Sequence, residues 1–302
     1  MKRLLNTLYI TSGNRYLSLD GENVVVMEDK KEIGRIPLHN LQAIVTFGYT
    51  GASPALMGAC AQRDIELSFM SGNGRFLARV SGEEKGNVTL RKTQYRISEK
   101  KEESVKIAKN FILGKVYNAR WVLERAARDY SMRLDAELLK KKSAFLGQSM
   151  NKIRECEDAG TLLGLEGEAA SVYFSAFDEL ILQQKEDFYF HGRNKRPPLD
   201  NVNAMLSFGY SLLAGMCGGT LEAVGLDPYV GFFHTDRPGR MSLALDLMEE
   251  FRSVMVDRFV LTPINKRIMK PEYFLTKENG AVIMTEEGRK AFLSAWQGKN
   301  RR

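Results

Sequence analysis

Residues 201–221, NVNAMLSFGYSLLAGMCGGTL, contain no charged side chain, and this stretch decides how we arrange the rest of the chain. Its length approaches the roughly 20 residues that span a bilayer. However, it includes two asparagines and two serines, and we expect the Gly218-Gly219 pair to end it early. We therefore predict a helix over 201–216 that is buried at the centre of a helical domain, and not a membrane segment.

Helical patterns extend from this stretch in both directions, from about residue 91 onwards. Apolar residues recur there at three-to-five-residue steps, as on one face of a helix. The further helices that we predict lie near 107–123, 130–146, 167–184, 242–260 and 286–296. Lysines and arginines, Lys115 among them, cover the remaining surface of the first of these helices. That surface either lies along phosphates or is a solvated face balanced by nearby acids.

The first 80 residues have a different pattern, with short strand-like runs separated by Gly, Asn and Asp. They predict a small antiparallel β unit and one helix over 53–63 that has Pro54 in its first position. Between 81 and 101 the apolar pattern lapses and charge rises, which is typical of a linker. The predicted fold class is therefore α+β, with an N-terminal β domain over 1–90 and a larger all-α domain over 91–302.

Composition limits the function classes. The chain has 302 residues, 44% of them hydrophobic, and a formal net charge of +7. The positive charge favours an anionic partner such as nucleic acid or a membrane surface. Its three cysteines are far apart, which argues against a disulfide framework and against a cysteine-based zinc site. With no signal-peptide pattern at the N-terminus, we expect a cytoplasmic protein.

A histidine and two acids form the first candidate site. Asp246 and Glu249 are three residues apart on the predicted helix after Ser242, which we take as its N-cap, and that helix should stop before Pro263. The polar turn over 235–240 allows His234 to fold back towards these acids. Two interpretations are open here: a divalent metal site, or acids that pair with arginines such as Arg252 or Arg240.

Two further stretches bear on that choice. Glu166 falls in line with Ala169 and Tyr173 on the face of a helix that should be buried, so it either points into the interior or is an acid at a helix N-terminus. The loop over 191–200 carries three basic side chains beside Pro197-Pro198, and it either contacts phosphates or is solvated.

Four ordered motifs carry a family resemblance. They are Gly164-Leu165-Glu166-Gly167 with Ala169-Ala170 and Tyr173, Arg196-Pro197-Pro198-Leu199-Asp200-Asn201-Val202-Asn203-Ala204 before Ser207-Phe208-Gly209-Tyr210, Gly225-Leu226-Asp227-Pro228 with Gly231-Phe232-Phe233-His234, and Ser242-Leu243-Ala244-Leu245-Asp246-Leu247-Met248-Glu249. Together they resemble the family of CRISPR-associated endonucleases and integrases that capture new spacers. The resemblance extends more loosely over the whole chain, because that family has a β domain followed by a helical catalytic domain.

The resemblance implies a catalytic site. Its metal ligands fall on Glu166, His234 and Glu249, with Asp246 as an assisting acid. Many members have aspartate as the last ligand, so Glu249 is a departure, and the neighbouring Glu250 is an alternative acid. One imidazole and two carboxylates, without a thiolate, suit Mg²⁺ or Mn²⁺.

The resemblance also implies the function and the partners. The expected function is a metal-dependent DNA endonuclease and integrase that inserts spacer DNA into a CRISPR array by transesterification. The expected partners are a pre-spacer duplex, the CRISPR repeat, a second copy of the chain bound through the β domains, and a small ferredoxin-like subunit that bridges two dimers into a heterohexamer, with no membrane. Candidate DNA contacts are the basic residues Arg193, Lys195, Arg196, Arg237 and Arg240.

Two rival functions remain open at this stage. One is a general metal-dependent nuclease on branched DNA or RNA, which the same ligands would serve. The other is a non-catalytic scaffold that bridges DNA, in which the acids pair with arginines.

Overall fold

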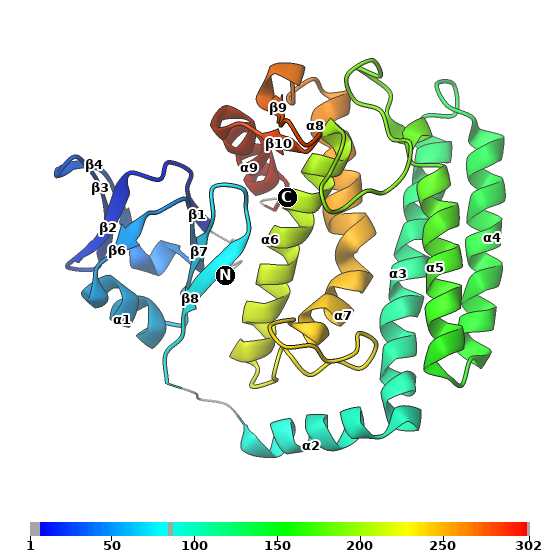
Figure 1. The fold of residues 1–302 in the computed structure, drawn as a ribbon, viewed down its shortest axis with the longest axis horizontal. Helices are drawn as coiled ribbons and strands as arrows, with labels where there is room; N and C mark the ends of the chain where they lie inside the picture. The colour runs from blue at the N-terminus through cyan, green and yellow to red at the C-terminus, as the bar shows by residue number, and fades with distance from the viewer. Residues whose placement is uncertain (1–6, 84–86, 301–302) are drawn as a thin grey trace. The chain divides into compact units, whose positions relative to one another are not determined.

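The computed structural model describes residues 7–83 and 87–300, and it has strands in its N-terminal part and mainly helices after them (Figure 1). The predicted α+β class is confirmed. The chain forms two compact units, one with residues 1–85, 272–275 and 283–302 and the other with residues 86–271 and 276–282. The C-terminal helix α9 (Glu286–Asn300) thus groups with the β unit in space, whereas the sequence assigns it to the helical domain. It is held there by contacts such as the hydrogen bond from Ser12 to Glu286 (2.7 Å).

The first unit contains two four-stranded sheets. Their strands are β1 (Thr7–Ile10), β2 (Arg15–Asp20), β3 (Asn23–Glu28), β4 (Lys31–Pro37), β5 (Ala43–Phe47), β6 (Gly51–Ala52), β7 (Glu66–Met70) and β8 (Phe76–Val80). One sheet has the order β4-β3-β2-β6 and the other β1-β5-β7-β8. The predicted strands are confirmed, but the pairing is not wholly antiparallel, because β1, β5 and β7 pair in parallel and β2 pairs in parallel with β6. A crossover through α1 (Pro54–Gln62) between β5 and β7 makes parallel pairing possible.

Helix α1 forms as the sequence predicts. The hydroxyl of Ser53 accepts a hydrogen bond from the backbone N–H of Leu56 (3.2 Å), and Pro54 follows at the first helical position. The helix buries Leu56 and Cys60 in the core of this unit, together with Leu17 and other apolar side chains of the strands.

The predicted linker is wrong over most of its length. Residues 84–86 lie outside the described part, but Val88–Glu99 form helix α2, capped by the side chain of Asn87. Its buried Gln94 donates to the backbone carbonyls of Asp227 (2.8 Å) and Val230 (2.9 Å) and accepts from the N–H of Asp227 (2.9 Å). A charged, weakly apolar segment therefore becomes a helix through a tertiary contact that local sequence does not reveal.

The second unit is a helical bundle. After α2 its helices are α3 (Lys101–Asp129), α4 (Ala136–Glu155), α5 (Ala159–Ser175), α6 (Asn201–Ala223), α7 (Ser242–Phe251) and α8 (Arg258–Asn265). Helix α3 packs against α4, α5 and α7, and α7 also packs against α6, so the long α3 joins the two halves of the bundle (Figure 1). A short two-stranded sheet, β9 (Phe274–Thr276) with β10 (Val282–Met284), follows the bundle.

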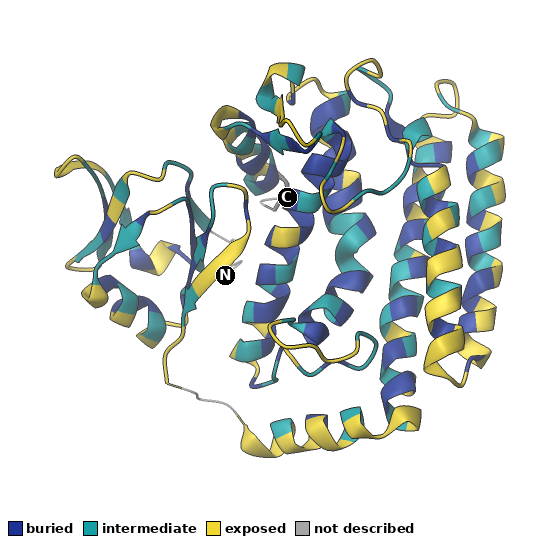
Figure 2. Cartoon of the chain, viewed as in Figure 1, coloured by how far each residue is buried: buried dark blue, intermediate teal, exposed yellow. Residues whose placement is uncertain are grey.

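Helix α6 is the predicted buried helix. By length and composition it could cross a bilayer, but 67% of its most apolar window is buried inside the fold (Figure 2). It begins at the predicted residue, capped by Asp200, but it continues through Gly218-Gly219 to Ala223. The predicted end was wrong because the cost of about 1 kcal/mol for each helical glycine is smaller than the gain from burying residues such as Leu221.

Other helix ends also differ from the prediction. Asp135 and Asp158 cap α4 and α5, so α4 starts later than predicted and α5 starts eight residues earlier. Glu166 consequently lies in the middle of α5, and the interpretation that places it at a helix N-terminus is wrong.

The helix predicted over 242–260 is confirmed in outline and wrong in detail. Ser242 is not its N-cap, because the hydroxyl of Ser242 donates instead to the carbonyl of Thr235 (3.2 Å). A π-helical turn over Arg252–Asp257 joins α7 to α8, and α8 continues past Pro263 to Asn265. π-Helical turns of this kind often occur at functional sites.

Candidate functional site

His234 folds back onto α7, as predicted. Its Nδ1 lies 2.7 Å from Oδ1 of Asp246, a side chain with no exposed surface. The same carboxylate accepts the backbone N–H groups of Phe232 (2.7 Å), Phe233 (2.9 Å) and His234 (2.8 Å). Because an ionised carboxylate only accepts hydrogen bonds, Nδ1 carries a proton, and in the neutral imidazole the lone pair then lies on Nε2. Asp246 therefore fixes both the loop and the orientation of the imidazole.

Gly231 makes this turn possible. A Cβ atom at this position would lie 2.8 Å from Cβ of Ser242 and 2.9 Å from Oδ2 of Asp246. Such contacts are too short for any side chain, so the backbone approaches α7 only because residue 231 is glycine.

The other two predicted ligands meet at Lys115. The ammonium of Lys115 forms ion pairs with Glu166 of α5 and with Oε2 of Glu249 of α7 (2.6 Å). Arg252 forms a further ion pair with Oε1 of Glu249 (3.3 Å). The side chains of Lys115, Glu166 and Glu249 are only 13%, 17% and 4% exposed. The sequence placed Lys115 on a solvated or phosphate-facing surface, whereas the fold makes it the shared partner of two acids.

The charge of Glu249 is stabilised despite its burial. Burial raises its pKa, but Lys115 and Arg252 outweigh burial and hold the pKa below its usual range, and the nearby His234 acts in the same direction. The neighbouring Glu250 takes a different environment, because its side chain lies against Gly114 of α3. Glu249, and not Glu250, thus lies with Glu166 and His234.

These donors fit a divalent cation. Within residues 7–83 and 87–300, no three His, Cys, Asp or Glu side chains already form a metal site, and Lys115 takes the position between the two glutamates. The carboxylates of Glu166 and Glu249 nevertheless share one cation, the ammonium of Lys115. Because Nδ1 of His234 faces Asp246, Nε2 is the ring nitrogen that remains to bind a metal. A hard oxygen and imidazole donor set of this kind suits Mg²⁺ or Mn²⁺. Asp246 then supports His234 from behind, as a carboxylate commonly does for a metal-bound imidazole.

Sequence reasoning missed the roles of Tyr210 and Asp257, two buried residues near the acids, although it named their neighbours Arg252 and Arg193 in other roles. The guanidinium groups of Arg252 (4.8 Å) and Arg193 (5.3 Å) both lie over the ring of Tyr210, and the hydroxyl of Tyr210 donates to Asp257 (2.5 Å). Burial raises the pKa of Asp257 to about 6. The contacts of Tyr210 join α6, the 191–200 loop and the π-helical turn, so local spacing could not indicate them.

The candidate DNA contacts divide into two groups. Arg193 donates to Asn203 (2.7 Å) and Ser207 (3.0 Å), and Arg240 donates to Thr235, so both side chains brace the fold.

Lys195, Arg196 and Arg237 are exposed. Although the residue is exposed overall, partial burial of its ammonium lowers the pKa of Lys195, and the nearby Arg252 and Arg193 lower it further.

Comparison with known proteins identifies the family. The model of the family described as CRISPR associated protein Cas1 matches residues 8–298. The chain belongs to the Cas1 family. The Cas1 protein of Rhodospirillum rubrum named "CRISPR-associated endonuclease Cas1 2" is 50% identical over 305 residues, which cover 100% of this chain and 88% of that protein. The resemblance drawn from the four motifs is confirmed.

Solved structures share this Cas1 fold. A casposase bound to its integration product has a TM-score of 0.82 at 25% identity, with 97% of this chain and 82% of that chain covered. A Cas6-RT-Cas1–Cas2 complex has a TM-score of 0.79 at 22% identity, with 99% of this chain and 32% of that chain covered. At that identity the second likeness concerns the fold alone.

Proposed function

We propose that this Cas1 chain is a DNA endonuclease and integrase that depends on Mg²⁺ or Mn²⁺ and inserts spacer DNA into a CRISPR array by transesterification. One observation carries the proposal: Glu166 and Glu249, from two separate helices, share a single cation beside an imidazole whose Nδ1 is fixed by Asp246. The family membership and the likeness to a casposase bound to its integration product support it.

Each residue of the site has a separate role in the proposed reaction. Glu166, His234 and Glu249 hold the metal, which when bound polarises a phosphoryl oxygen and stabilises charge that develops in the reaction. Asp246 keeps the imidazole in one tautomer and one orientation. Arg252 holds Glu249 from its other oxygen. The exposed Lys195, Arg196 and Arg237 contact backbone phosphates on either side of the reacting bond.

We further propose that the protein works in the cytoplasm as an assembly. The first unit forms a homodimer, and a small ferredoxin-like subunit bridges two dimers into a heterohexamer that holds the pre-spacer duplex and the repeat. Membership of the Cas1 family, from which these partners are expected, supports this proposal.

The rival functions make different predictions. A scaffold would retain the pairs that Lys115 and Arg252 make with Glu249, and it would not bind metal. A general nuclease would bind metal and cut DNA or RNA without joining strands. The assay therefore mixes the full chain with its small partner, a pre-spacer duplex, repeat DNA and Mn²⁺, and looks for branched products on a denaturing gel.

We expect branched products from the wild-type protein and at least about a 100-fold loss with Glu166→Gln, His234→Ala or Glu249→Gln, because each variant removes a charged carboxylate or the imidazole that binds the metal. Glu250→Gln is the matched control, since its side chain faces Gly114, and it should keep wild-type activity. Joining at the wild-type rate by any of the three ligand variants would reject the assignment. Cleavage without joining would favour the general nuclease.

A further inference from the structure

Lys115 lies largely out of contact with solvent in this fold. Its side chain is 13% exposed and pairs with two glutamates from different helices. An ammonium and a divalent ion that bind the same carboxylate oxygens would lie close together, and like charges at such distances repel strongly. If the two glutamates bind metal, the ammonium has to leave them.

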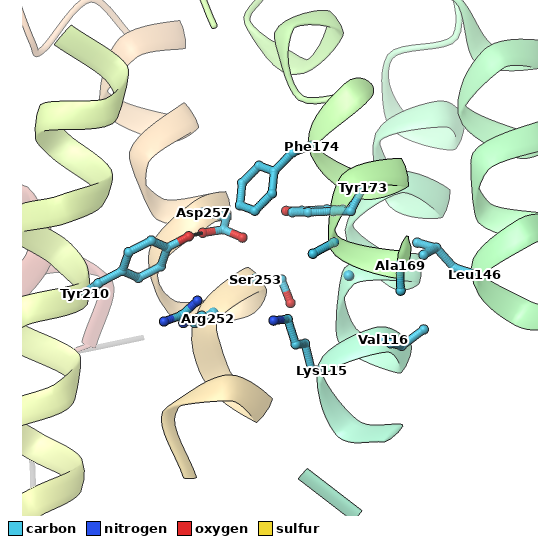
Figure 3. Close-up of a pocket in the computed structure, with 12 residues that line it drawn as sticks. Lys115, Val116, Leu146, Ala169, Tyr173, Phe174, Tyr210, Arg252, Ser253 and Asp257 are labelled. Atoms are coloured by element: carbon cyan, nitrogen blue, oxygen red, sulfur yellow. Dashed lines mark hydrogen bonds between the residues drawn. The ribbon is translucent and has the colours of Figure 1, made fainter. Parts of the chain in front are cut away.

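A small cavity beside the acid site offers the ammonium another position (Figure 3). Its volume is about 30 Å³, and its lining includes Lys115, Arg252, Ser253 and Asp257. A cavity of that volume holds about one water molecule or a group of similar size.

The cavity contains acceptors suited to an ammonium. Among the side chains that the structure describes, the buried hydroxyl of Ser253 has no hydrogen-bond partner. Asp257 provides a carboxylate on the next turn of the same π-helical segment. Glu166 and Glu249 are absent from the lining of this cavity. An ammonium that moved there would exchange two carboxylates for one carboxylate and a hydroxyl.

We propose that Lys115 is a built-in counter-cation that the divalent metal displaces, and that its ammonium then moves to Ser253 and Asp257. The inference rests on the proposed function in one respect, namely that Glu166 and Glu249 bind a metal. In the metal-free protein, Lys115 links α5 to α7 through its ion pairs with Glu166 and Glu249. It also sets the concentration of metal at which the site fills.

A direct test measures Mn²⁺ binding to the full chain without DNA, at pH 7.5, by electron paramagnetic resonance of the free ion. Lys115→Met should bind Mn²⁺ about tenfold more tightly than the wild-type protein, which is within the usual range of coupling between two binding events. Lys106→Met is the matched control, because it removes an exposed lysine from the same helix, and its affinity should equal that of the wild type. Equal or weaker binding by Lys115→Met would overturn the proposal.

Simple removal of positive charge would also tighten metal binding, so a double-mutant cycle is needed. Asp257→Asn replaces the carboxylate in the cavity with a neutral amide, a weaker partner for an ammonium, and should weaken Mn²⁺ binding about fivefold when Lys115 is present. It should have no effect in the Lys115→Met background, because no ammonium then needs that position. Equal effects in the two backgrounds would overturn the displacement account and leave only general electrostatics.

Two controls separate the possible failures. Circular dichroism confirms that each variant folds, and Lys115→Gln replaces Lys115→Met if the latter does not, with the same tighter binding expected. If neither the wild-type protein nor any Lys115 variant binds Mn²⁺ at millimolar concentration, the metal site of the proposed function fails. If the wild type binds and Lys115 has no effect, only the inference about Lys115 fails.

Discussion

At the scale of single residues, the site depends on a few side chains with several partners each. Asp246 accepts three backbone N–H groups and faces His234, while Lys115 pairs with Glu166 and Glu249. Spacing and family resemblance predicted the acids and the histidine, because those residues lie in recognisable motifs. Lys115 and Asp257 could not be predicted, since their roles come from helices far apart in the sequence.

Asp246→Asn tests the orienting role of this carboxylate. An amide cannot accept all the N–H groups that Asp246 accepts, so the imidazole loses its fixed tautomer. We expect a loss of about 10- to 100-fold in Mn²⁺ affinity, the range seen for such supporting carboxylates. Asp236→Asn, a change of an exposed acid that accepts from the backbone of Gly231 (3.3 Å), is the control and should lose little. Unchanged affinity in Asp246→Asn would contradict the role assigned here.

Asp257 should make stability depend on pH. Its pKa rises from the usual 3.8 to about 6 in the folded protein, because burial disfavours the charged form. The folded state therefore binds the proton more tightly than the unfolded state, and the free energy of unfolding falls as the pH rises from about 4 to 6. At neutral pH the shifted pKa of Asp257 lowers the free energy of unfolding by roughly 3 kcal/mol at most.

Urea unfolding at pH 5 and at pH 7.5 checks this expectation. Asp257→Asn cannot ionise, so its stability relative to the wild type should increase between the two pH values. A difference between the two proteins that stays constant over this interval would show that Asp257 does not titrate there.

At the scale of secondary-structure elements, the sequence pattern predicted the strands of the first unit apart from the two-residue β6, and the approximate place of most helices. It failed where a cap or a tertiary contact decided the outcome. Asp158 starts α5 ahead of the predicted range, α6 continues through a glycine pair, and α2 replaces an expected linker. The parallel pairing of β1, β5 and β7 also depends on a crossover that strand patterns do not encode.

Gln94→Leu tests why α2 is a helix. The substitution leaves two carbonyls and one N–H of the loop at 227–230 without their partner, at a cost of about 1–3 kcal/mol in unfolding free energy. Hydrogen exchange in α2 should also become faster. Lys92→Ala, on the exposed side of α2, is the control and should change stability by about 0.5 kcal/mol or less. Equal stability of the two variants would contradict this explanation.

At the scale of the whole molecule, every residue of the candidate site belongs to the helical unit. Lys115, Glu166, His234 and Glu249 all lie within residues 86–271. The charge of +7 pointed to an anionic partner, and family membership agrees with a protein that acts on nucleic acid. The C-terminal helix α9 shows that strand-like and helical sequence patterns do not fully define the domains. It is helical, but it groups with the β unit.

The central claim is that Glu166, His234 and Glu249 bind one divalent metal. Anomalous diffraction from crystals grown with Mn²⁺ tests it most directly. We predict one peak within about 2.0–2.6 Å of a carboxylate oxygen of each glutamate and of Nε2 of His234, with Asp246 still bound to Nδ1. A peak held by Glu250 or Asp246 in place of these ligands, or no peak beside Glu249 at saturating Mn²⁺, would contradict the account.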